Sequence, residues 1–136
     1  DIDELVLGID DGTVDVISSN HQPQDFDSKN CEFDKASFGI ISLQTFYSNI
    51  LELSRKIPFD KLLPTFTSNP RKILGLDTYK IEEGDFASFT IFDDKGSWDY
   101  NEETNISKSL NSPWLNWSLK GKVKGVVVGK NFNIDG

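Results

Sequence analysis

One short run constrains the fold of this chain more than any other feature: a β-branched segment that ends in polar residues. The sequence TVDVISS, Thr13–Ser19, has the length and composition of a strand, and NHQPQ follows it directly. In α/β proteins, ligands gather at the carboxyl ends of parallel strands. Because the polar loop over 20–36 is unusually long for a compact domain, we expect a functional edge at this point.

Helical segments are predicted in the portion around this edge. Their apolar spacing and cap residues place them over 2–9, 38–54, 60–66 and 69–75. The first is a short amphipathic stretch closed by the turn DDGT. Pro64 should kink or shorten the third, because proline cannot donate a backbone hydrogen bond. In the fourth we expect Asn69 to be the cap residue and Gly75 to end the turn.

Beyond residue 76 the sequence alternates as β-structure does. Strands are predicted over 86–92 and 122–132, the second containing a tight turn at Gly129-Lys130. Gly84 permits a turn between two strands, and the irregular stretch before residue 122 holds all three tryptophans. We therefore expect two portions, an α/β portion over 1–78 and a mainly β portion over 79–136.

The charge and composition exclude several classes of partner. The chain has 14 Lys and Arg against 22 Asp and Glu, a formal charge of −8, which repels phosphate backbones and anionic lipids. We therefore expect no nucleic-acid partner. We also expect no membrane partner, because in addition no apolar run approaches the ~20 residues of a membrane span. The single Cys31 and the absence of signal-peptide features indicate a cytoplasmic protein. The absence of methionine indicates a fragment of something longer.

The residues by themselves carry little chemistry. His21 is the only histidine, so this chain cannot form the clustered ligand shell of a zinc or two-metal site. No nucleophile elbow accompanies it, and a structural role is favoured over that of a general base. Paired acidic residues next to turns are ordinary solvated turns. The aromatic residues of the second portion are more typical of a core than of a ligand platform.

Five motifs in one order add a specific resemblance. They are DGTVDVISSNHQPQ, FGIISLQT, TSNPRKILGL, IEEGDFASFTIFD and SKSLNSPWLNWSLKGKVKGVVVGK. Together, over about Ile9 to Phe132, they resemble the C-terminal third of the dihydroorotases of the cyclic amidohydrolase superfamily. The resemblance implies an α/β fold: the C-terminal part of a metal-dependent-hydrolase TIM barrel, with Val14–Ser19 as its last strand and helices that close it, plus strands of a small β-sandwich.

The resemblance also implies site residues. After this strand the family has the pattern Asp-His-Ala-Pro-His, in which the aspartate contacts the metal and acts as general base, and the last histidine holds the substrate carboxylate. Here Asn20 stands at the aspartate position, His21 is kept, and Gln24 stands at the last histidine. Phe38 and Gly39 match the family's backbone clamp on the substrate. The substrate-binding positions are thus His21, Gln24, Phe38 and Gly39, and the catalytic position is Asn20.

Asn20 implies impaired chemistry, because an amide cannot transfer a proton near neutral pH. Loss of a positioned base costs typically ~10²- to 10⁴-fold in rate. In the next predicted helix Gln44 replaces a glutamate that is common in relatives. The remaining metal ligands of the family lie upstream of these motifs. We therefore expect this chain alone to hold no metal and to be inactive, and whether the protein is an enzyme stays open.

The function implied by the family is the interconversion of dihydroorotate and N-carbamoyl-aspartate in pyrimidine biosynthesis, on a small cyclic amide or ureido acid. Two alternatives stay open. One is a non-catalytic assembly partner of aspartate carbamoyltransferase, and the other is an amidohydrolase of altered specificity. Because only the end of a barrel is implied, we expect its apolar surface to associate with the remainder of the barrel or with a second copy.

Overall fold

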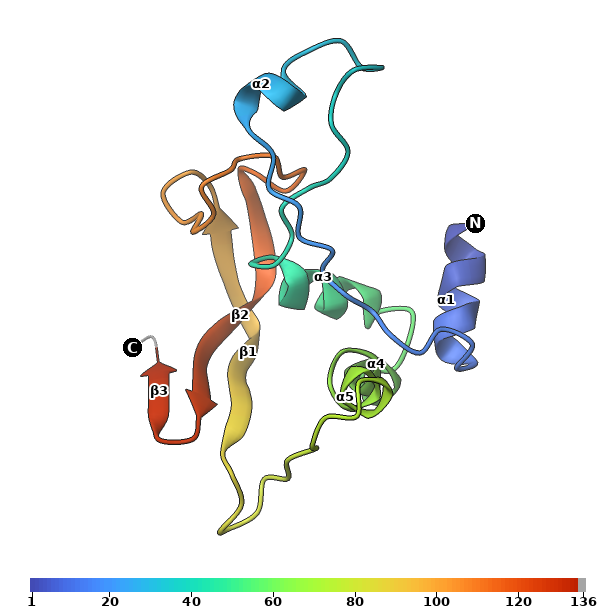
Figure 1. Ribbon diagram of the computed structural model, residues 1–136, viewed down its shortest axis with the longest axis vertical. Helices are drawn as coiled ribbons and strands as arrows, with labels where there is room; N and C mark the ends of the chain where they lie inside the picture. Colours follow the sequence, from blue (N-terminus) through green and yellow to red (C-terminus); the bar gives the residue numbers. More distant parts are fainter. Residues whose placement is uncertain (135–136) are drawn as a thin grey trace.

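The computed structural model describes residues 1–134 and contains helices in its first part and an antiparallel sheet in its second (Figure 1). The elements are α1 (Ile2–Asp10), α2 (Phe26–Lys29), α3 (Phe46–Leu53), α4 (Phe59–Phe66), α5 (Ser68–Ile73), β1 (Ser88–Tyr100), β2 (Trp117–Val128) and β3 (Asn131–Ile134). Figure 1 shows α3 between the long β1–β2 ribbon and the helices α1, α4 and α5. No helix of residues 1–134 is long and apolar enough to cross a membrane.

The predicted strand over Thr13–Ser19 is not part of a sheet. Residues 14–20 carry no helix or strand assignment, and within residues 1–134 they have no strand as a neighbour. The Ile17 N–H donates to Thr65 O (3.0 Å), and the next residue after the segment, His21, forms a single parallel bridge with Ile40. A strand exists only through its ladder of backbone hydrogen bonds, and this segment has isolated contacts in place of a ladder.

The helix predicted over 38–54 begins eight residues later, at Phe46. Gly39 has φ +111°, a conformation that a helix does not contain. Ile41 donates its N–H to the carbonyl oxygen of Asn111 (3.1 Å), so its backbone is paired outside any helix. Of the apolar residues before α3, Ile41 is buried, whereas Leu43 is 64% exposed and lies in the turn that leads into the helix.

The two following helices agree with the prediction except at one cap. Pro64 lies inside α4, which ends two residues later at Phe66. Thr67, rather than Asn69, is the N-cap of α5. The Asn69 side chain instead donates to Asp15 O (3.0 Å). This bond joins α5 to residues 14–20, which we call the extended segment. Gly75 follows α5 with φ +65°, as predicted for a residue that ends a helical turn.

The hydrophobic core lies between the helices. Its fully buried centre consists of Ile50, Ile57 and Leu62. Partly buried apolar side chains surround this centre: Val6, Ile9, Ile17, Phe46, Leu53, Phe59 and Phe66. Burial of one such aliphatic side chain contributes about 1.5–3 kcal/mol. Ile17 is the contact through which the extended segment joins this core.

The sheet has the order β1-β2-β3 and is antiparallel throughout. The β1–β2 register runs from Ser88 opposite Val128 to Tyr100 opposite Trp117, with shifts after Ile91 and after Asp93. The predicted turn at Gly129-Lys130 joins β2 to β3, and Gly129 has the positive φ (+61°) that the turn needs.

Three details of the second portion differ from the sequence prediction. The irregular stretch is strand at both of its ends, since Trp98 lies in β1 and Trp117 in β2. The strand predicted over 122–132 is two strands that meet at the turn. Gly84 does form a turn, with φ +95°, but within the described chain no strand precedes it.

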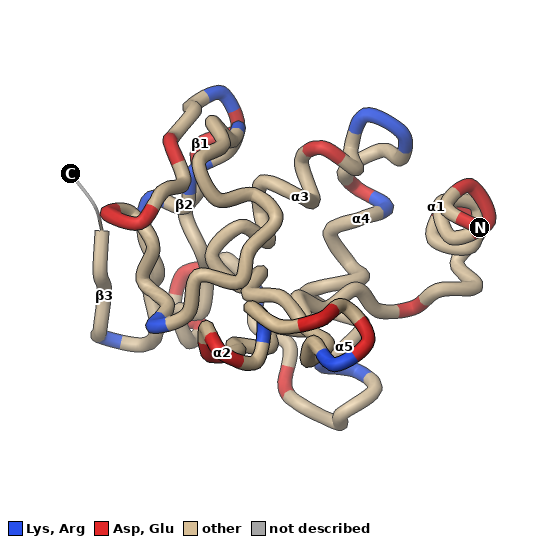
Figure 2. The backbone as a smooth tube through the Cα atoms, turned by 90° about the horizontal axis from the view of Figure 1, so that it is seen from above, with Lys and Arg blue, Asp and Glu red and all other residues tan. Residues whose placement is uncertain are grey.

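Helix α3 packs directly on the β ribbon. Both Ser48 Oγ and Trp98 Nε1 donate to Gly121 O, each at 3.0 Å. The rings of Tyr47 and Phe92 lie with centroids 4.3 Å apart. These contacts join the two predicted portions, and the division at residues 78 and 79 stays a prediction. Figure 2 shows basic and acidic residues interspersed along the described chain.

Candidate functional site

The predicted site residues lie on two neighbouring loops, which we call the rim: residues 20–24 and 38–41. The parallel bridge between His21 and Ile40 joins them, and Gln22 N–H donates to Ile40 O (2.8 Å). The first loop follows the extended segment and the second precedes α3. The structure therefore brings all five predicted site residues into one place.

His21 has a structural role through one of its ring nitrogens. Its Nδ1 accepts hydrogen bonds from the backbone N–H groups of Ser42 and Leu43, both at 3.1 Å. A ring nitrogen that accepts carries no proton, so the ring N–H is the one at Nε2. The interaction satisfies two N–H groups just before the turn that leads into α3. Only Nε2 is left for contact with a ligand.

Asn20 adopts a left-handed backbone conformation at the start of the rim. Its φ is 44°, in a region that asparagine and aspartate tolerate better than other residues with a side chain. The side chain is exposed, and its Oδ1 accepts from Gln22 Nε2 at 3.0 Å. An aspartate would fit the same backbone, so the difference between the two residues here is chemical rather than conformational.

Gln24 uses its side chain within the protein. Its Nε2 donates to the carbonyl oxygen of Phe38 (3.0 Å), and its backbone carbonyl accepts from Ser109 Oγ. Its backbone N–H donates to Asn111 Oδ1 at 3.3 Å. The predicted substrate-binding position thus braces the predicted clamp through a bond to Phe38.

Gly39 occupies a place that no other residue could fill without strain. Its φ of +111° disfavours a side chain, and a Cβ here would lie 2.6 Å from Gln22 Cβ. Its carbonyl oxygen accepts from Asn111 Nδ2 (3.1 Å) and from Lys29 Nζ (3.3 Å). The neighbouring Phe38 is 93% exposed.

Sequence reasoning missed the residues that hold the rim together. Asn111 and Ser109 lie in the loop between β1 and β2, which the sequence analysis treated as irregular. Lys29 belongs to α2, a single helical turn inside the predicted polar loop, capped by Asp25 Oδ1 at Ser28 N (2.7 Å). The only available signal was that SKSLNSPW belongs to one of the five motifs.

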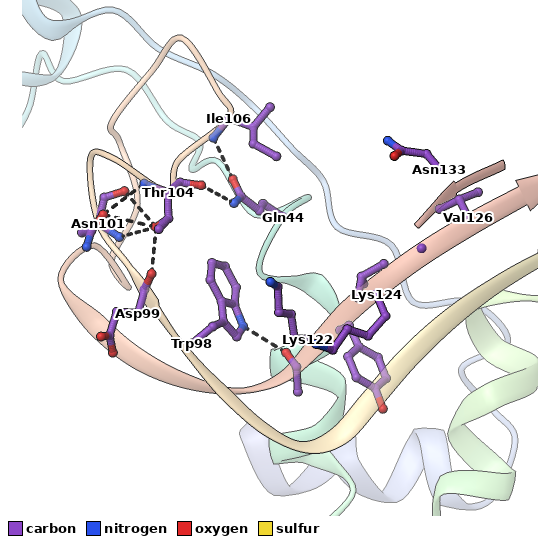
Figure 3. Close-up of a pocket in the computed structure, with 14 residues that line it drawn as sticks. Gln44, Trp98, Asp99, Asn101, Thr104, Ile106, Lys122, Lys124, Val126 and Asn133 are labelled. Carbon is purple, nitrogen blue, oxygen red and sulfur yellow. Dashed lines mark hydrogen bonds between the residues drawn. The ribbon is translucent and has the colours of Figure 1, made fainter. Parts of the chain in front are cut away.

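Gln44 holds the same loop between β1 and β2 at another point. Its Nε2 donates to Thr104 O (2.7 Å), and its Oε1 accepts from the Ile106 N–H (2.9 Å). Figure 3 shows the Gln44 side chain pointing to both of these residues. Glutamine supplies the donor and the acceptor that these two bonds need, whereas a glutamate carboxylate only accepts.

One hollow of the structure lies apart from the rim residues. It has a volume of about 730 Å³ and is bordered by α3, the β ribbon and the loop after β1 (Figure 3). Its lining includes Gln44, Trp98 and Lys124 but none of the predicted site residues. A second hollow of about 210 Å³ lies at the end of the extended segment, against Ser18, Ser19 and Ile40.

The described residues do not by themselves fit a metal centre. Within residues 1–134 no group of three His, Cys, Asp or Glu side chains could hold a metal ion. His21 has one nitrogen occupied by backbone N–H groups, and Asn20 offers a neutral amide, which is a poor ligand for a dication.

The sequence is similar to curated dihydroorotases along nearly its whole length. It is 42% identical over 136 residues to that of Endomicrobium trichonymphae, covering 97% of this chain and 32% of the relative. With that of Aquifex aeolicus it shares 44% over 122 residues, covering 88% and 28%. The chain is a dihydroorotase homologue of the amidohydrolase superfamily. The predicted resemblance is confirmed, although no protein-family model matches the sequence.

This dihydroorotase homologue spans about a third of the length of the curated relatives it matches. Its structure is similar to L-hydantoinase (dihydropyrimidinase) from Arthrobacter aurescens, with a TM-score of 0.79, 18% identity, and coverage of 96% of this chain and 31% of the other. D-hydantoinase from Thermus sp. gives 0.78 at 17% identity, covering 98% and 31%. The predicted fold class, part of an amidohydrolase TIM barrel with strands of a small β domain, is thereby confirmed.

Proposed function

We propose that the protein to which this chain belongs is a cytoplasmic, dihydroorotase-like cyclic amidohydrolase of pyrimidine biosynthesis, impaired in proton transfer. Its substrate class would be a cyclic amide such as dihydroorotate, or the ureido acid that ring opening produces. The observation that carries the proposal is the assembled rim, in which Asn20, His21 and the Phe38-Gly39 pair are held together at the end of the extended segment.

The chemistry left to the rim is binding and positioning. The Asn20 amide donates and accepts hydrogen bonds but cannot take a proton from an attacking water near neutral pH. The His21 Nε2–H is a donor for a ligand oxygen, because Nδ1 is occupied by Ser42 and Leu43. In this proposal the zinc of the family would be held by residues outside the described portion.

The first prediction concerns the missing base. In the full-length protein, Asn20→Asp should raise the rate of carbamoyl-aspartate cyclisation by roughly 10²- to 10⁴-fold, because it restores a positioned carboxylate. Its backbone conformation, φ 44°, accommodates aspartate. Zinc content is measured in parallel, so that loss of metal is distinguished from loss of the base.

Asn69→Asp is the matched control, because the Asn69 amide bonds Asp15 O away from the rim. It should leave the rate unchanged. A wild-type rate that equals or exceeds that of Asn20→Asp would overturn the proposed impairment and favour an amidohydrolase of altered specificity.

One observation favours a second candidate, a non-catalytic partner of aspartate carbamoyltransferase. The Gln24 side chain donates to Phe38 O. The side chain at the position that would hold a substrate carboxylate is therefore already hydrogen-bonded within the protein. If Asn20→Asp combined with Gln24→His remains inactive while the full-length protein co-elutes with aspartate carbamoyltransferase, this second function is supported. Absence of co-elution counts against it.

A further inference from the structure

Asn111 is the residue on which the two loops of the rim converge. Its Nδ2 donates to Gln22 O and to Gly39 O, both at 3.1 Å. Its Oδ1 accepts from the Gln24 N–H (3.3 Å), and Ser109 Oγ shares its one proton between this Oδ1 and Gln24 O. A primary amide has two donors and two acceptor lone pairs, and both donors of this side chain are used.

The backbone of Asn111 adds a fifth bond. Its carbonyl oxygen accepts from the Ile41 N–H at 3.1 Å, just beyond the clamp. One residue of the loop between β1 and β2 thus contacts both loops of the rim, across sequence separations of 72 and 89 residues. Such a contact sets the distance between the two loops directly.

These bonds fix the orientation of the clamp. Gly39 O is held by Asn111 and Lys29, and Phe38 O is held by Gln24 Nε2. In a trans peptide the N–H points away from the carbonyl of the same unit, so the Gly39 N–H is directed away from Gln24. Among the described residues no acceptor is assigned to that N–H.

The side chain at position 111 must be an amide of this length. Aspartate keeps the shape and the acceptor oxygen but places a second, charged oxygen against the carbonyl groups of Gln22 and Gly39. Two donated bonds would then become two repulsive contacts. Asn111→Asp therefore tests the two hydrogen bonds donated by the amide, because the volume of the side chain is nearly unchanged.

We propose that Asn111 is a positioning residue for the substrate clamp: it sets the Phe38-Gly39 peptide against residues 20–24 so that the Gly39 N–H faces a carbonyl or carboxylate oxygen of the ligand. This inference rests on the proposed function. It assigns the loop between β1 and β2 a part in substrate affinity, although Asn111 itself contacts no ligand.

The test compares Asn111→Asp with wild type in the full-length protein. The dissociation constants of dihydroorotate and carbamoyl-aspartate should rise about 5- to 30-fold, as expected for loss of one or two hydrogen bonds of about 1 kcal/mol each. Without ligand, amide hydrogen exchange of Gln24 and Ile41 should accelerate by a similar factor. Where turnover is measurable, KM should change more than kcat.

Two further variants keep the test decisive. Lys29→Met removes the other donor to Gly39 O, together with its hydrogen bond to Ser37 O, at a partly buried position of α2. It should weaken binding in the same direction, even if Asn111→Asp unfolds. Asn69→Asp removes a single amide donor in α5 and should change neither binding nor exchange.

Unchanged dissociation constants in Asn111→Asp and Lys29→Met, with the wild type binding normally, would overturn the inference. A wild-type protein that binds neither ligand would overturn the proposed function and, with it, the substrate role of Asn111. Hydrogen exchange distinguishes the two failures, because it reports the fixing of the clamp without any ligand.

Discussion

At the scale of single residues, several polar groups have roles that differ from those their sequence position implies. His21 is an acceptor for two backbone N–H groups, and Gln24 braces Phe38 rather than facing a ligand. Both residues belong to the motif that resembles a catalytic one. The hydrogen-bond partners show that the motif also stabilises the loops that carry it.

Tyr47 carries a prediction about pH. Its hydroxyl is buried and, among the described residues, has no hydrogen-bond partner. Burial, and after it the carboxylates of Asp94 and Asp93, raise the pKa of Tyr47 from 10.0 to about 12. Between these values the folded state keeps a proton that the unfolded state has lost. The free energy of unfolding should therefore fall as pH rises from about 10 to about 12.

Tyr47→Phe should reduce this alkaline fall and raise stability at neutral pH by up to about 1 kcal/mol, because it removes an orphaned hydroxyl. Part of the fall should remain, since burial also raises the pKa of Tyr100. Urea unfolding at a series of pH values measures both effects. Tyr100→Phe is the contrast, because it removes a bond from the hydroxyl to Asn105 (3.1 Å) and should destabilise. A Tyr47→Phe variant less stable than wild type would contradict the prediction.

At the scale of elements, the contact of α3 with β2 decides how the helices sit on the sheet. Gly121 is the point of closest approach, with φ +80° and a carbonyl that accepts from both Ser48 and Trp98. A Cβ at this position would lie 2.2 Å from Leu51 Cδ1 and 2.9 Å from Tyr47 Cε1. The absence of a side chain here lets the helix approach the strand.

Gly121→Ala should accordingly destabilise the protein by roughly 2–4 kcal/mol, adding overpacking to the cost of a left-handed backbone. Gly12→Ala is the matched control, because Gly12 has a similar φ of +84° with nothing within 4 Å of its Cβ position. It should cost only about 1–2 kcal/mol. Thermal unfolding, monitored by tryptophan fluorescence, measures the loss of stability in each variant. Equal losses in Gly121→Ala and Gly12→Ala would show that the contact between α3 and β2 adds no overpacking.

At the scale of the whole molecule, much apolar surface is uncovered. Large hydrophobic side chains such as Phe33 and Ile81 are 99% and 86% exposed, and Ile2, Leu5 and Leu7 on α1 are also exposed. Where such exposed apolar side chains lie together, they mark a surface that another chain segment or molecule covers. We therefore expect the 136-residue chain to require a partner surface.

The corresponding prediction is that this chain, expressed by itself, self-associates with increasing concentration, or stays soluble only with the remainder of the barrel. Sedimentation velocity across a concentration series measures this. A well-dispersed monomer at all concentrations would contradict the expectation. Adding the remainder of the protein as a separate chain is the control, and it should convert the self-associated species into a defined complex.

The sequence by itself determined the local elements and the family. Apolar spacing and proline positions predicted α4, the end of α3 and the hairpin at Gly129, because each depends on neighbours a few residues away. Motif order placed the five candidate site residues. Only the tertiary structure decided where α3 begins, which partners His21 and Gln24 have, and that Asn111 joins the two loops of the rim. Those features depend on hydrogen bonds between residues up to 89 positions apart, which no local pattern records.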